Sequence, residues 1–574
     1  MKIRFAILLI SFAVVNVSCQ KQAHQNATAW SASKGFGIVT KNSVADVLVD
    51  AEDSKTVRLA AKLFSDDIER VTGKKAKVKN SVDNASKVCV IVGTIEDSSL
   101  IKELIDNGKI DVSKVKGKWE SHLRQVVKKP FDGIKEALVI AGSDRRGAAY
   151  GLLDISKQMG VSPWYYFADV AVKKSDTIYA DPSRHIQKSP SVKYRGIFIN
   201  DEMWSLRPWA MNNVAPHEGS GIGPTTHKII FEMMLRIKAN YLWPAMHLHT
   251  EPFNSYEQNK VVADEYGIVM GASHIEPMLR NNMRFAEWDR EYPDEPWDYV
   301  ENRDHIYEYW EKRAKENGMY ENVWTLGKRG KDDHAGSDIT VPVLEQIFAD
   351  QREILKKWVN PDITKVPQVL IPYTEVLGLY NKGLKVPDDV IICWPDDNFG
   401  NIRQLPNEKE RQRSGGSGIY YHFQWINGAT SAYPWLNTHP LALTWTEMKK
   451  AYDFGARKLW IVNVGDIKPF EINIDHFMKM AWDISDFQQN DPEGFLREWA
   501  TENFATQYAD DIADVMAKHY ELGYQRRPEH MHTFRHWRTP KYKYDYFSIE
   551  NYNDEAQKRI DAYDKLIKKA EAIY

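Results

Sequence analysis

Cysteine is nearly missing from this chain, with three in 574 residues. So few thiols exclude a disulfide framework, and the two that follow the N-terminal segment, Cys89 and Cys393, cannot form a metal site by themselves. Both lie in apolar, strand-like runs, so we expect buried thiols. An excess of positive charge is also missing, because the net charge is −3. The composition therefore gives no reason to expect binding to nucleic acid or to an acidic membrane surface.

Long apolar runs are limited to the N-terminus, where a basic start and the apolar run 5–15 precede Cys19. This pattern is typical of a secretory signal and is too short for a transmembrane helix. Residues 1–19 are therefore predicted to be a signal peptide, and the protein to be exported to the periplasm or the outer membrane of a bacterium. Cys19 resembles the lipidated cysteine of bacterial lipoproteins, although Asn16 departs from that pattern. A membrane tether through Cys19 and release into the periplasm are both left open.

Eight short apolar runs within residues 192–465 each end in polar, acidic or aromatic residues. Segments with helical periodicity, such as 226–238 and 341–359, separate most of them. Strands and helices that alternate about eight times over this length predict a (β/α)8 TIM barrel, with its active site at the carboxyl ends of the strands. The runs are Val192–Asn200, Asn240–His247, Ile268–His274, Asn322–Gly327, Gln368–Glu375, Val390–Asp397, Gly418–His422 and Lys458–Asn463.

The rest of the chain predicts two flanking regions. Residues 20–35 are polar, and we expect a tether. Residues 36–188 alternate strands and helices, which indicates a small α/β support domain. A Pro-bearing linker at 181–190 leads into the barrel, residues 189–485. Residues 486–574 show helical spacing alone and predict a helical bundle, which we expect to be incomplete because the last residues read as the middle of a helix.

The ends of the eight runs bring many polar side chains to one face of the expected barrel. Carboxylates, histidines and an arginine that converge in this way indicate an enzyme. The residues are Asn200, Asp201 and Glu202, Met246 and His247, Ser273 and His274, Arg329 with Asp332 and Asp333, Tyr373 and Glu375, Asp396, Asp397 and Asn398, Tyr421 and His422, and Asn463.

A metal or phosphate site is not predicted. His247 and His249 have the spacing of a zinc pair, but a barrel metallohydrolase needs further histidines on later strands. The fifth run offers Tyr373 and Glu375 instead. The glycine-rich run 415–418 precedes a strand rather than opening a helix, so it presents no helix N-terminus to an anion. We expect neither a metal nor a cofactor.

A surplus of carboxylates with aromatic residues favours a glycoside hydrolase. That reaction needs two carboxyl groups that flank the scissile bond, one protonated and one ionised. Several acids in a closed pocket raise the pKa of one of them, which supplies the proton donor. The chain also has 19 Trp and 28 Tyr, whose flat faces suit sugar rings but also fill cores. For any single strand-end carboxylate, a salt bridge is as good an explanation as catalysis. Salt bridges explain the presence of the whole set of carboxylates less well.

Longer motifs resemble glycoside hydrolase family 115, the xylan α-1,2-glucuronidases. The resemblance covers nearly the whole chain after the signal. Asp333 has the spacing of the family's Arg-Gly-x-x-Asp loop, whereas Trp425 stands where the family usually has Tyr. The motifs are YRGIFINDE at 194–202, ANYLWPAMH at 239–247, GASHIEPM at 271–278, LGKRG at 326–330, YTEV at 373–376, WPDDNFG at 394–400 and YYH at 420–422.

The resemblance implies an inverting enzyme that removes (4-O-methyl-)glucuronic acid side chains from glucuronoxylan or its oligosaccharides without a metal. It also implies an α/β domain, a barrel, a helical bundle and a C-terminal β-sandwich, in a homodimer. We expect the sandwich to be missing from this chain, which puts the homodimer in doubt.

The strand-end residues can be given roles as hypotheses. We predict Glu375 as the general acid. For the general base, Asp396 or Asp397 is the first candidate, and Asp333 and Asp201 come next. Because inversion places a water between base and sugar, the two carboxyl groups should stand about 6.5–9.5 Å apart.

The substrate carries a carboxylate, so donors are needed to bind it. We predict that Arg329 clamps this carboxylate, assisted by His274 and His422. Trp243 and Tyr421 are predicted to stack on the sugar ring, with core packing an equal explanation for Trp243. The other candidates for substrate binding are Asn200, Glu202, His247, Asp332, Tyr373, Asn398, Trp425 and Asn463.

Three other interpretations stay open. One is an α-glucuronidase that acts on short oligosaccharides. The second is a non-catalytic glycan-binding lipoprotein, although the strand-end acids that such a protein would be expected to lose are present. The third is an inactive fragment.

Overall fold

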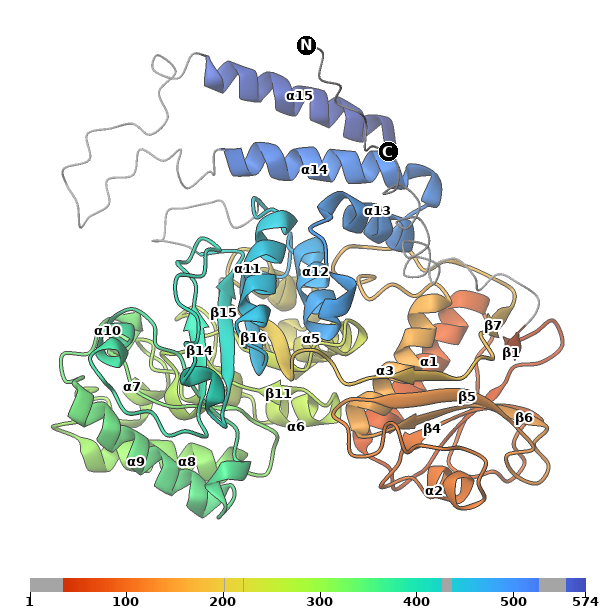
Figure 1. Cartoon of the computed structure of the whole chain (residues 1–574), viewed down its shortest axis with the longest axis horizontal. Helices are drawn as coiled ribbons and strands as arrows, with labels where there is room; N and C mark the ends of the chain where they lie inside the picture. The colour runs from red at the N-terminus through yellow and green to blue at the C-terminus, as the bar shows by residue number, and fades with distance from the viewer. Residues whose placement is uncertain (1–34, 201, 220, 426–435, 526–553, 574) are drawn as a thin grey trace, which may run out of the picture.

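The computed structural model describes residues 35–200, 202–219, 221–425, 436–525 and 554–573. Along the chain, an N-terminal α/β region is followed by an eight-stranded sheet with its helices and then by C-terminal helices (Figure 1). The predicted signal peptide with Cys19, most of the predicted tether and the candidate base Asp201 lie outside the described residues.

The N-terminal region contains a six-stranded mixed sheet in the order β3-β2-β4-β6-β5-β8. The sequence predicts β2, β4, β6, α1 and α3 at nearly their observed positions, because apolar runs alternate with segments of helical spacing. The elements are β2 (Asp46–Val49), α1 (Lys55–Thr72), β3 (Val78–Lys79), β4 (Val88–Thr94), α2 (Ser99–Asp106), β5 (His122–Lys128), β6 (Glu136–Gly142), α3 (Arg145–Gln158) and β8 (His185–Gln187).

The predicted linker, residues 181–190, contains the short strand β8 of the N-terminal sheet. This short strand pairs antiparallel with β5, and Ile186 stands opposite Leu123. None of its three residues is buried, so it carries no apolar run that could reveal it. A second, separate antiparallel pair joins β1 (Phe36–Val39) to β7 (Ile178–Ala180).

The central sheet has eight parallel strands in the order β11-β10-β9-β16-β15-β14-β13-β12. Six strands lie within the predicted apolar runs, whereas β15 begins one residue before its run and β16 ends two residues after its run. The runs are continuous because both faces of a parallel strand are covered. The strands are β9 (Tyr194–Ile199), β10 (Tyr241–Trp243), β11 (Val269–Met270), β12 (Trp324–Thr325), β13 (Gln368–Leu370), β14 (Ile391–Pro395), β15 (Ser417–His422) and β16 (Leu459–Gly465).

A parallel bridge between Met270 and Asn322 connects the two outermost strands, β11 and β12. The amide of Met270 donates to the carbonyl of Glu321 (3.1 Å), and the amide of Val323 donates to the carbonyl of Met270 (2.9 Å). The sheet therefore curls back on itself, which is consistent with the predicted (β/α)8 barrel.

Helices lie between most consecutive strands of this sheet. Between β14 and β15 there is only a 3-10 turn, Glu410–Gln412, so the alternation is not complete at that crossover. The helices are α4 (Leu206–Trp209), α5 (Pro224–Arg236), α6 (Glu257–Glu265), α7 (Glu287–Glu291), α8 (Arg303–Asn317), α9 (Val341–Trp358), α10 (Glu375–Asn381), α11 (Leu441–Asp453) and α12 (Glu471–Trp482).

Aromatic and aliphatic side chains fill the interior of the curled sheet. This interior cluster includes Phe198, Tyr241, Trp243, Tyr420 and Ile461, all buried. The interior is thus a packed core rather than a channel, and a site for chemistry has to lie above it, at one end of the strands.

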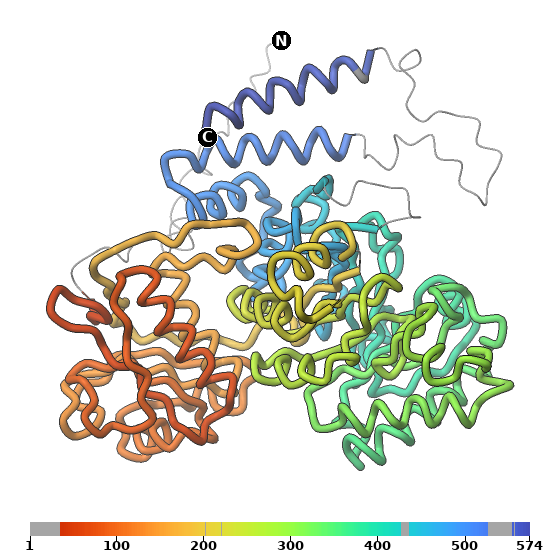
Figure 2. Tube along the Cα trace, turned by 180° about the vertical axis from the view of Figure 1, so that it is seen from behind, coloured from red at the N-terminus to blue at the C-terminus, as the bar shows by residue number. Residues whose placement is uncertain are grey.

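The N-terminal region packs against the amino ends of the strands. Buried Glu120 accepts hydrogen bonds from Nη2 of Arg195 (2.6 Å), at the start of β9, and from Nδ2 of Asn240 (2.7 Å), just before β10. It also accepts one from Nε of Arg146 (2.7 Å) in α3. Seen from behind, the N-terminal region lies beside the central sheet and its helices (Figure 2). This attachment leaves the carboxyl ends of the strands uncovered by the N-terminal region.

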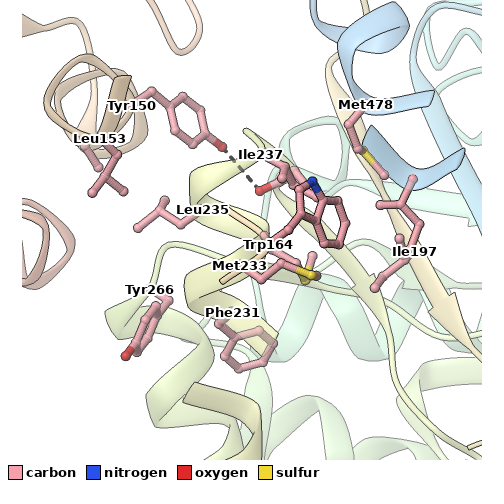
Figure 3. Packing of buried hydrophobic residues seen from close by; sticks show 14 of the residues in the cluster. Tyr150, Leu153, Trp164, Ile197, Phe231, Met233, Leu235, Ile237, Tyr266 and Met478 are labelled. Atoms are coloured by element: carbon pink, nitrogen blue, oxygen red, sulfur yellow. Dashed lines mark hydrogen bonds between the residues drawn. The ribbon is translucent and has the colours of Figure 1, made fainter. Parts of the chain in front are cut away.

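Helices α3 and α5 form a second part of this contact. Tyr150 and Leu153 of α3 lie toward Leu235 of α5 in the shared core (Figure 3). The hydroxyl of Tyr150 donates to the carbonyl of Ala239, 3.4 Å away. The two regions therefore share one apolar core rather than meeting through a flexible linker.

The C-terminal residues are helical, as the spacing after 486 predicts. The helices are α13 (Pro492–Asn503), α14 (Ala509–Gln525) and α15 (Glu555–Ile573), and α14 and α15 lie side by side (Figures 1 and 2). No helix among the described residues is both long and apolar enough to span a membrane. Cys89 and Cys393 are buried free thiols, as predicted.

Candidate active site

Arg329 is the centre of the polar cluster at the carboxyl ends of the strands. It follows β12, and its side chain is only 4% exposed. Its Nε donates to Oε1 of Glu375 and its Nη2 to Oε2, both at 2.8 Å, and its Nη1 donates to Asp333. Nη2 also donates to Oγ1 of Thr374 (2.9 Å). One guanidinium therefore holds two of the predicted catalytic carboxylates, and Arg329 is already engaged where the prediction has it clamp a substrate.

These contacts set the charge of both carboxylates. Burial favours protonation of Glu375, but hydrogen bonds from Arg329 and Thr374 outweigh it and lower its pKa. Burial acts the same way on Asp333, where the bond to His274 and the charges of His274 and Arg329 lower the pKa. Both groups are therefore ionised in this structure at neutral pH. A general acid needs a raised pKa, so Glu375 requires a change at Arg329 before it can donate a proton.

His274 and Tyr373 form the wall beside this ion cluster. Nε2 of His274 lies 3.1 Å from Oδ1 of Asp333, and the His274 ring lies over Tyr373 with centroids 4.2 Å apart. Burial lowers the pKa of His274 despite the nearby Asp333. Its buried Nδ1 has no hydrogen-bond partner among the described residues. The neutral ring can therefore offer this nitrogen to a ligand.

Tyr373 and His247 complete that wall. The hydroxyl of Tyr373 donates to Oδ1 of Asn398 (3.0 Å), and burial, with the charge of Asp333, raises the pKa of Tyr373 to about 12. Burial lowers the pKa of His247, against the influence of Asp333. Both side chains are therefore neutral hydrogen-bonding groups near Asp333 at physiological pH.

Asp396 and His422 form a buried pair. Oδ1 of Asp396 lies 2.6 Å from Nδ1 of His422, and the same carboxylate accepts from the amides of Asn398 (2.9 Å), Gly400 (3.1 Å) and His422 (2.9 Å). A carboxylate at this distance favours the tautomer that carries its proton on Nδ1. Nε2 of His422, buried and without a partner among the described residues, is then left as an acceptor.

The carboxylates of Asp396 and Asp397, which the sequence predicts as the leading candidates for the base, are both bound by several donors. Every oxygen of Asp396 is occupied by groups of its own turn and of β15. Asp397 accepts from the amides of Phe399 (3.1 Å) and Asn401 (3.0 Å) and from Nη2 of Arg403 (2.7 Å). Asp333, whose side chain is 43% exposed, has the more accessible carboxylate.

Asp332 holds a loop rather than the ion cluster. Its Oδ1 accepts from the amide of Arg284 (2.6 Å) and its Oδ2 from Nε of Arg284 (3.0 Å). These hydrogen bonds join the loop after β12 to the loop after β11. The contribution of Asp332 is therefore to hold these two loops together.

Two predicted sugar-stacking rings are buried instead. Trp243 is fully buried in the interior cluster, and its Nε1 donates to the hydroxyl of Tyr241 (2.7 Å), so the core-packing explanation fits it. Tyr421 points to the other side of β15, into the core beneath α12, and its hydroxyl donates to the carbonyl of Gly400 (2.9 Å). Neither ring has a face open to a ligand, and the stacking role predicted for Tyr421 is wrong on this ground. Trp425 is half-buried, beside Phe399.

The remaining predicted residues lie at the ends of β9 and β16. The amide of Asn200 donates to the carbonyl of Gly465 (3.0 Å), and Nδ2 of Asn463 donates to the hydroxyl of Tyr420 (3.4 Å). Glu202 is fully buried and accepts from Thr250. Among the described residues, no three His, Cys, Asp or Glu side chains are grouped as metal ligands would be.

Comparisons with known proteins identify the family. A family model described as glycosyl hydrolase family 115 matches residues 187–530. The solved structure of BtGH115A, described as a family GH115 4-O-methyl-alpha-glucuronidase with specificity for decorated arabinogalactans, is 40% identical with a TM-score of 0.84. The alignment covers 92% of this chain and 68% of that one. The chain belongs to glycosyl hydrolase family 115.

Other similarities to this family 115 chain are distant. CpGH84D is 11% identical with a TM-score of 0.49, covering 83% of this chain and 70% of its own. A Streptomyces plicatus beta-hexosaminidase is 9% identical with a TM-score of 0.47, covering 85% and 94%. Neither value supports an argument about function. A search of curated proteins finds no match.

Sequence reasoning did not single out three further polar residues at the carboxyl ends of the strands. Tyr420 packs between Trp243, Tyr373 and His422 at the top of the interior cluster. Thr374 contacts both Arg329 and Glu375. Asp466, which follows β16, accepts from the amides of Ser205 (2.8 Å) and Leu206 (3.1 Å), and burial raises its pKa to about 6. A signal existed for Tyr420, since it lies two residues before His422 and must face the same side of the strand.

Proposed function

We propose that this chain is an inverting α-glucuronidase that releases (4-O-methyl-)glucuronic acid side chains from decorated glycans. The observation that carries the proposal is the Arg329 centre, where one guanidinium holds Glu375 and Asp333 at the carboxyl ends of neighbouring strands. The identity to a 4-O-methyl-α-glucuronidase over most of the chain supports the reaction class.

The substrate itself can provide the change that Glu375 needs. A uronate carboxylate that enters the site competes with Glu375 for the guanidinium of Arg329. Once Glu375 loses these hydrogen bonds, burial dominates and its pKa rises. Glu375 then takes up a proton from solvent and becomes a donor only when a carboxylate-bearing substrate is bound.

Cleavage then follows the two-carboxylate scheme. Glu375 gives its proton to the glycosidic oxygen, and the bond from that oxygen to the anomeric carbon breaks. Asp333 takes a proton from a water molecule, whose oxygen bonds to the anomeric carbon from the opposite face. The products are a free uronic acid of inverted configuration and a glycan with a hydroxyl at the former branch point. Nε2 of His422 and Nδ1 of His274, which have no hydrogen-bond partner among the described residues, are our candidates for binding hydroxyl groups of the sugar.

The relative's specificity favours an arabinogalactan main chain, and the resemblance to xylan α-1,2-glucuronidases makes glucuronoxylan the second candidate. We also propose export, based on residues 1–19, either into the periplasm or to the outer membrane with Cys19 as the point of a membrane tether.

Proton NMR of the anomeric signals tests the reaction. The wild-type chain should release uronic acid that appears first as the β-anomer, from one of the two polysaccharides. Glu375→Gln and Asp333→Asn should each lower kcat at least about a hundredfold. Glu311→Gln, in an exposed ion pair with Lys357, is the matched control and should retain activity. Initial release of the α-anomer, or full activity of Glu375→Gln, would contradict the mechanism.

A further inference from the structure

Phe285 is the most exposed Phe, Tyr or Trp side chain of the described residues, at 68% exposure. It also has a φ of +63°, in the left-handed region that a bulky side chain rarely adopts. An exposed apolar ring on a strained backbone costs free energy twice over, through its contact with water and through its conformation. Such a cost indicates that the position serves a ligand.

The backbone of Phe285 is fixed by neighbours on both sides. Its amide donates to Oδ2 of Asp289 (2.8 Å), and its carbonyl accepts from Nε of Arg290 (2.9 Å). The flanking residues Met283 and Ala286 are buried in the interior cluster of the barrel. The ring is therefore held out into solvent by a rigid loop, so that little conformational entropy is lost when a ligand packs against it.

This loop is continuous with the candidate active site. Arg284, the residue before Phe285, is bound through its amide and side chain to Asp332, whose neighbour Asp333 contacts Arg329. The loop after β10 borders the same side, because Arg290 forms a bidentate ion pair with Glu251 (2.7 and 3.2 Å). Leu248, 47% exposed, adds apolar surface on that loop.

The charges around Phe285 indicate what kind of ligand fits. The basic side chains around this loop are paired with carboxylates: Arg284 with Asp332, Arg290 with Glu251 and Lys331 with Asp289. The ring thus stands among neutralised charges and hydrogen-bonding groups. The apolar C–H face of a neutral pyranose suits such a ring, whereas a second anionic group would meet cations that are already paired. One ring is also far smaller than the roughly 800 Å² per partner of a stable protein interface.

We propose that Phe285 is the sugar-stacking residue of a subsite for the glycan main chain, the neutral sugars that carry the uronic acid branch. This rests on the proposed function, since it takes the uronic acid to be held at Arg329. The subsite makes the enzyme specific for a branch on a polymer rather than for the uronic acid alone.

The test compares the wild-type chain with Phe285→Ala and Phe285→Trp, and with Phe454→Ala as control. Phe454 is also exposed (47%), but it follows α11 and precedes β16, at the amino end of the strands. Release of uronic acid is measured from the decorated polysaccharide and from the disaccharide of uronic acid and one main-chain sugar. Binding of main-chain oligosaccharides without uronic acid is measured by calorimetry, independently of catalysis.

Phe285→Ala should raise KM on the polysaccharide about tenfold and weaken oligosaccharide binding about as much, with the disaccharide unaffected. Phe285→Trp and Phe454→Ala should behave like the wild type. An equal loss on polymer and disaccharide, or unchanged oligosaccharide binding, overturns the subsite. If oligosaccharides bind through Phe285 but no variant or wild-type chain releases uronic acid, the proposed function fails while the subsite stands.

Discussion

At the residue scale, hydrogen bonds decide what each carboxylate of the site can do. Asp333 and Glu375 share one guanidinium and are partly open to solvent, so a ligand can change their charge. Asp396 is closed in by four donors and instead fixes His422. The buried carboxyl of Glu276 accepts a hydrogen bond from the hydroxyl of Ser273 (3.4 Å). The neighbours of a carboxyl group thus decide whether it is ionised, orients another side chain or stays neutral.

Asp396→Asn tests the orienting role. The amide can still accept hydrogen bonds, but it no longer selects the tautomer of His422 that leaves Nε2 as an acceptor. We expect kcat to fall about a hundredfold, with little change in thermal stability. His422→Ala should lower kcat by a similar factor. The kcat of the double variant should be no lower than that of the less active single variant. Independent, additive losses in steady-state kinetics would show that Asp396 acts elsewhere.

Glu276→Gln tests the buried neutral carboxyl. Burial, together with the charge of Glu287, raises the pKa of Glu276 to about 8 from an ordinary 4.5, and the hydrogen bond from the hydroxyl of Ser273 (3.4 Å) offsets this only in part. A raised folded-state pKa means that the protonated form stabilises the fold below pH 4.5, and that this contribution is lost as pH rises through 8.

Because glutamine cannot ionise, the variant should match the wild type near pH 4.5 and become more stable by up to about 4 kcal/mol near pH 8.5. Urea denaturation at the two pH values measures the difference. Glu353→Gln, on the exposed side of α9, is the control for the exchange of a glutamate for a glutamine. A Glu276→Gln variant that is less stable at pH 8.5 would mean that the carboxyl is ionised and paired.

At the scale of elements, strained turns follow the strands that carry the site. Thr374, between β13 and α10, has φ +46° and ψ −112°, and Asp332, Asp333 and Asn398 also have positive φ. Such conformations cost about 1–3 kcal/mol each for non-glycine residues, and they aim side chains at positions that relaxed loops do not reach. At Thr374 the strain directs both Oγ1 and the following Glu375 toward Arg329.

Thr374→Gly separates strain from function. Glycine adopts this conformation without strain, so the variant should be at least as stable as the wild type in thermal melting. It loses the hydroxyl that holds Arg329 and Glu375, and we expect kcat/KM to fall about a hundredfold. Thr374→Ser keeps the hydroxyl and should retain most of the activity. A glycine variant that is fully active and less stable would contradict this account.

The elements were largely predictable, whereas the turns between them were not. Parallel strands covered on both faces are continuous apolar runs, and this is why the eight runs match β9 to β16 to within two residues at the strand ends. The ion cluster at Arg329 could not be derived, since it depends on the backbone of Asp333 and Thr374. The error at Tyr421 has a simpler cause: adjacent residues of a strand face opposite sides, so the choice of His422 implied Tyr420. Phe285 belongs to no sequence motif, so its proposed role could be inferred only from the structure.

At the scale of the whole molecule, two buried ion networks join the N-terminal region to the barrel. In one, Glu120 lies between Arg146 and Arg195; in the other, Asp67 of α1 pairs with Arg236 of α5 (2.8 Å). All of these side chains are almost completely buried. Because both networks lie at the amino ends of the strands or on the covering helices, they should affect folding without touching the chemistry.

Glu120→Gln tests that separation. The change leaves Arg146 and Arg195 buried without the carboxylate between them, and removal of one partner of a buried ion pair costs about 3–5 kcal/mol. We expect a loss of this size in the free energy of unfolding measured with urea. Activity per folded molecule at low temperature should not change, because Arg329 and Glu375 lie at the other end of the strands. Glu96→Gln removes an exposed pair with Lys116 (3.6 Å) and should leave stability unchanged. A stable Glu120→Gln protein with reduced activity would instead mean that the N-terminal region shapes the active site.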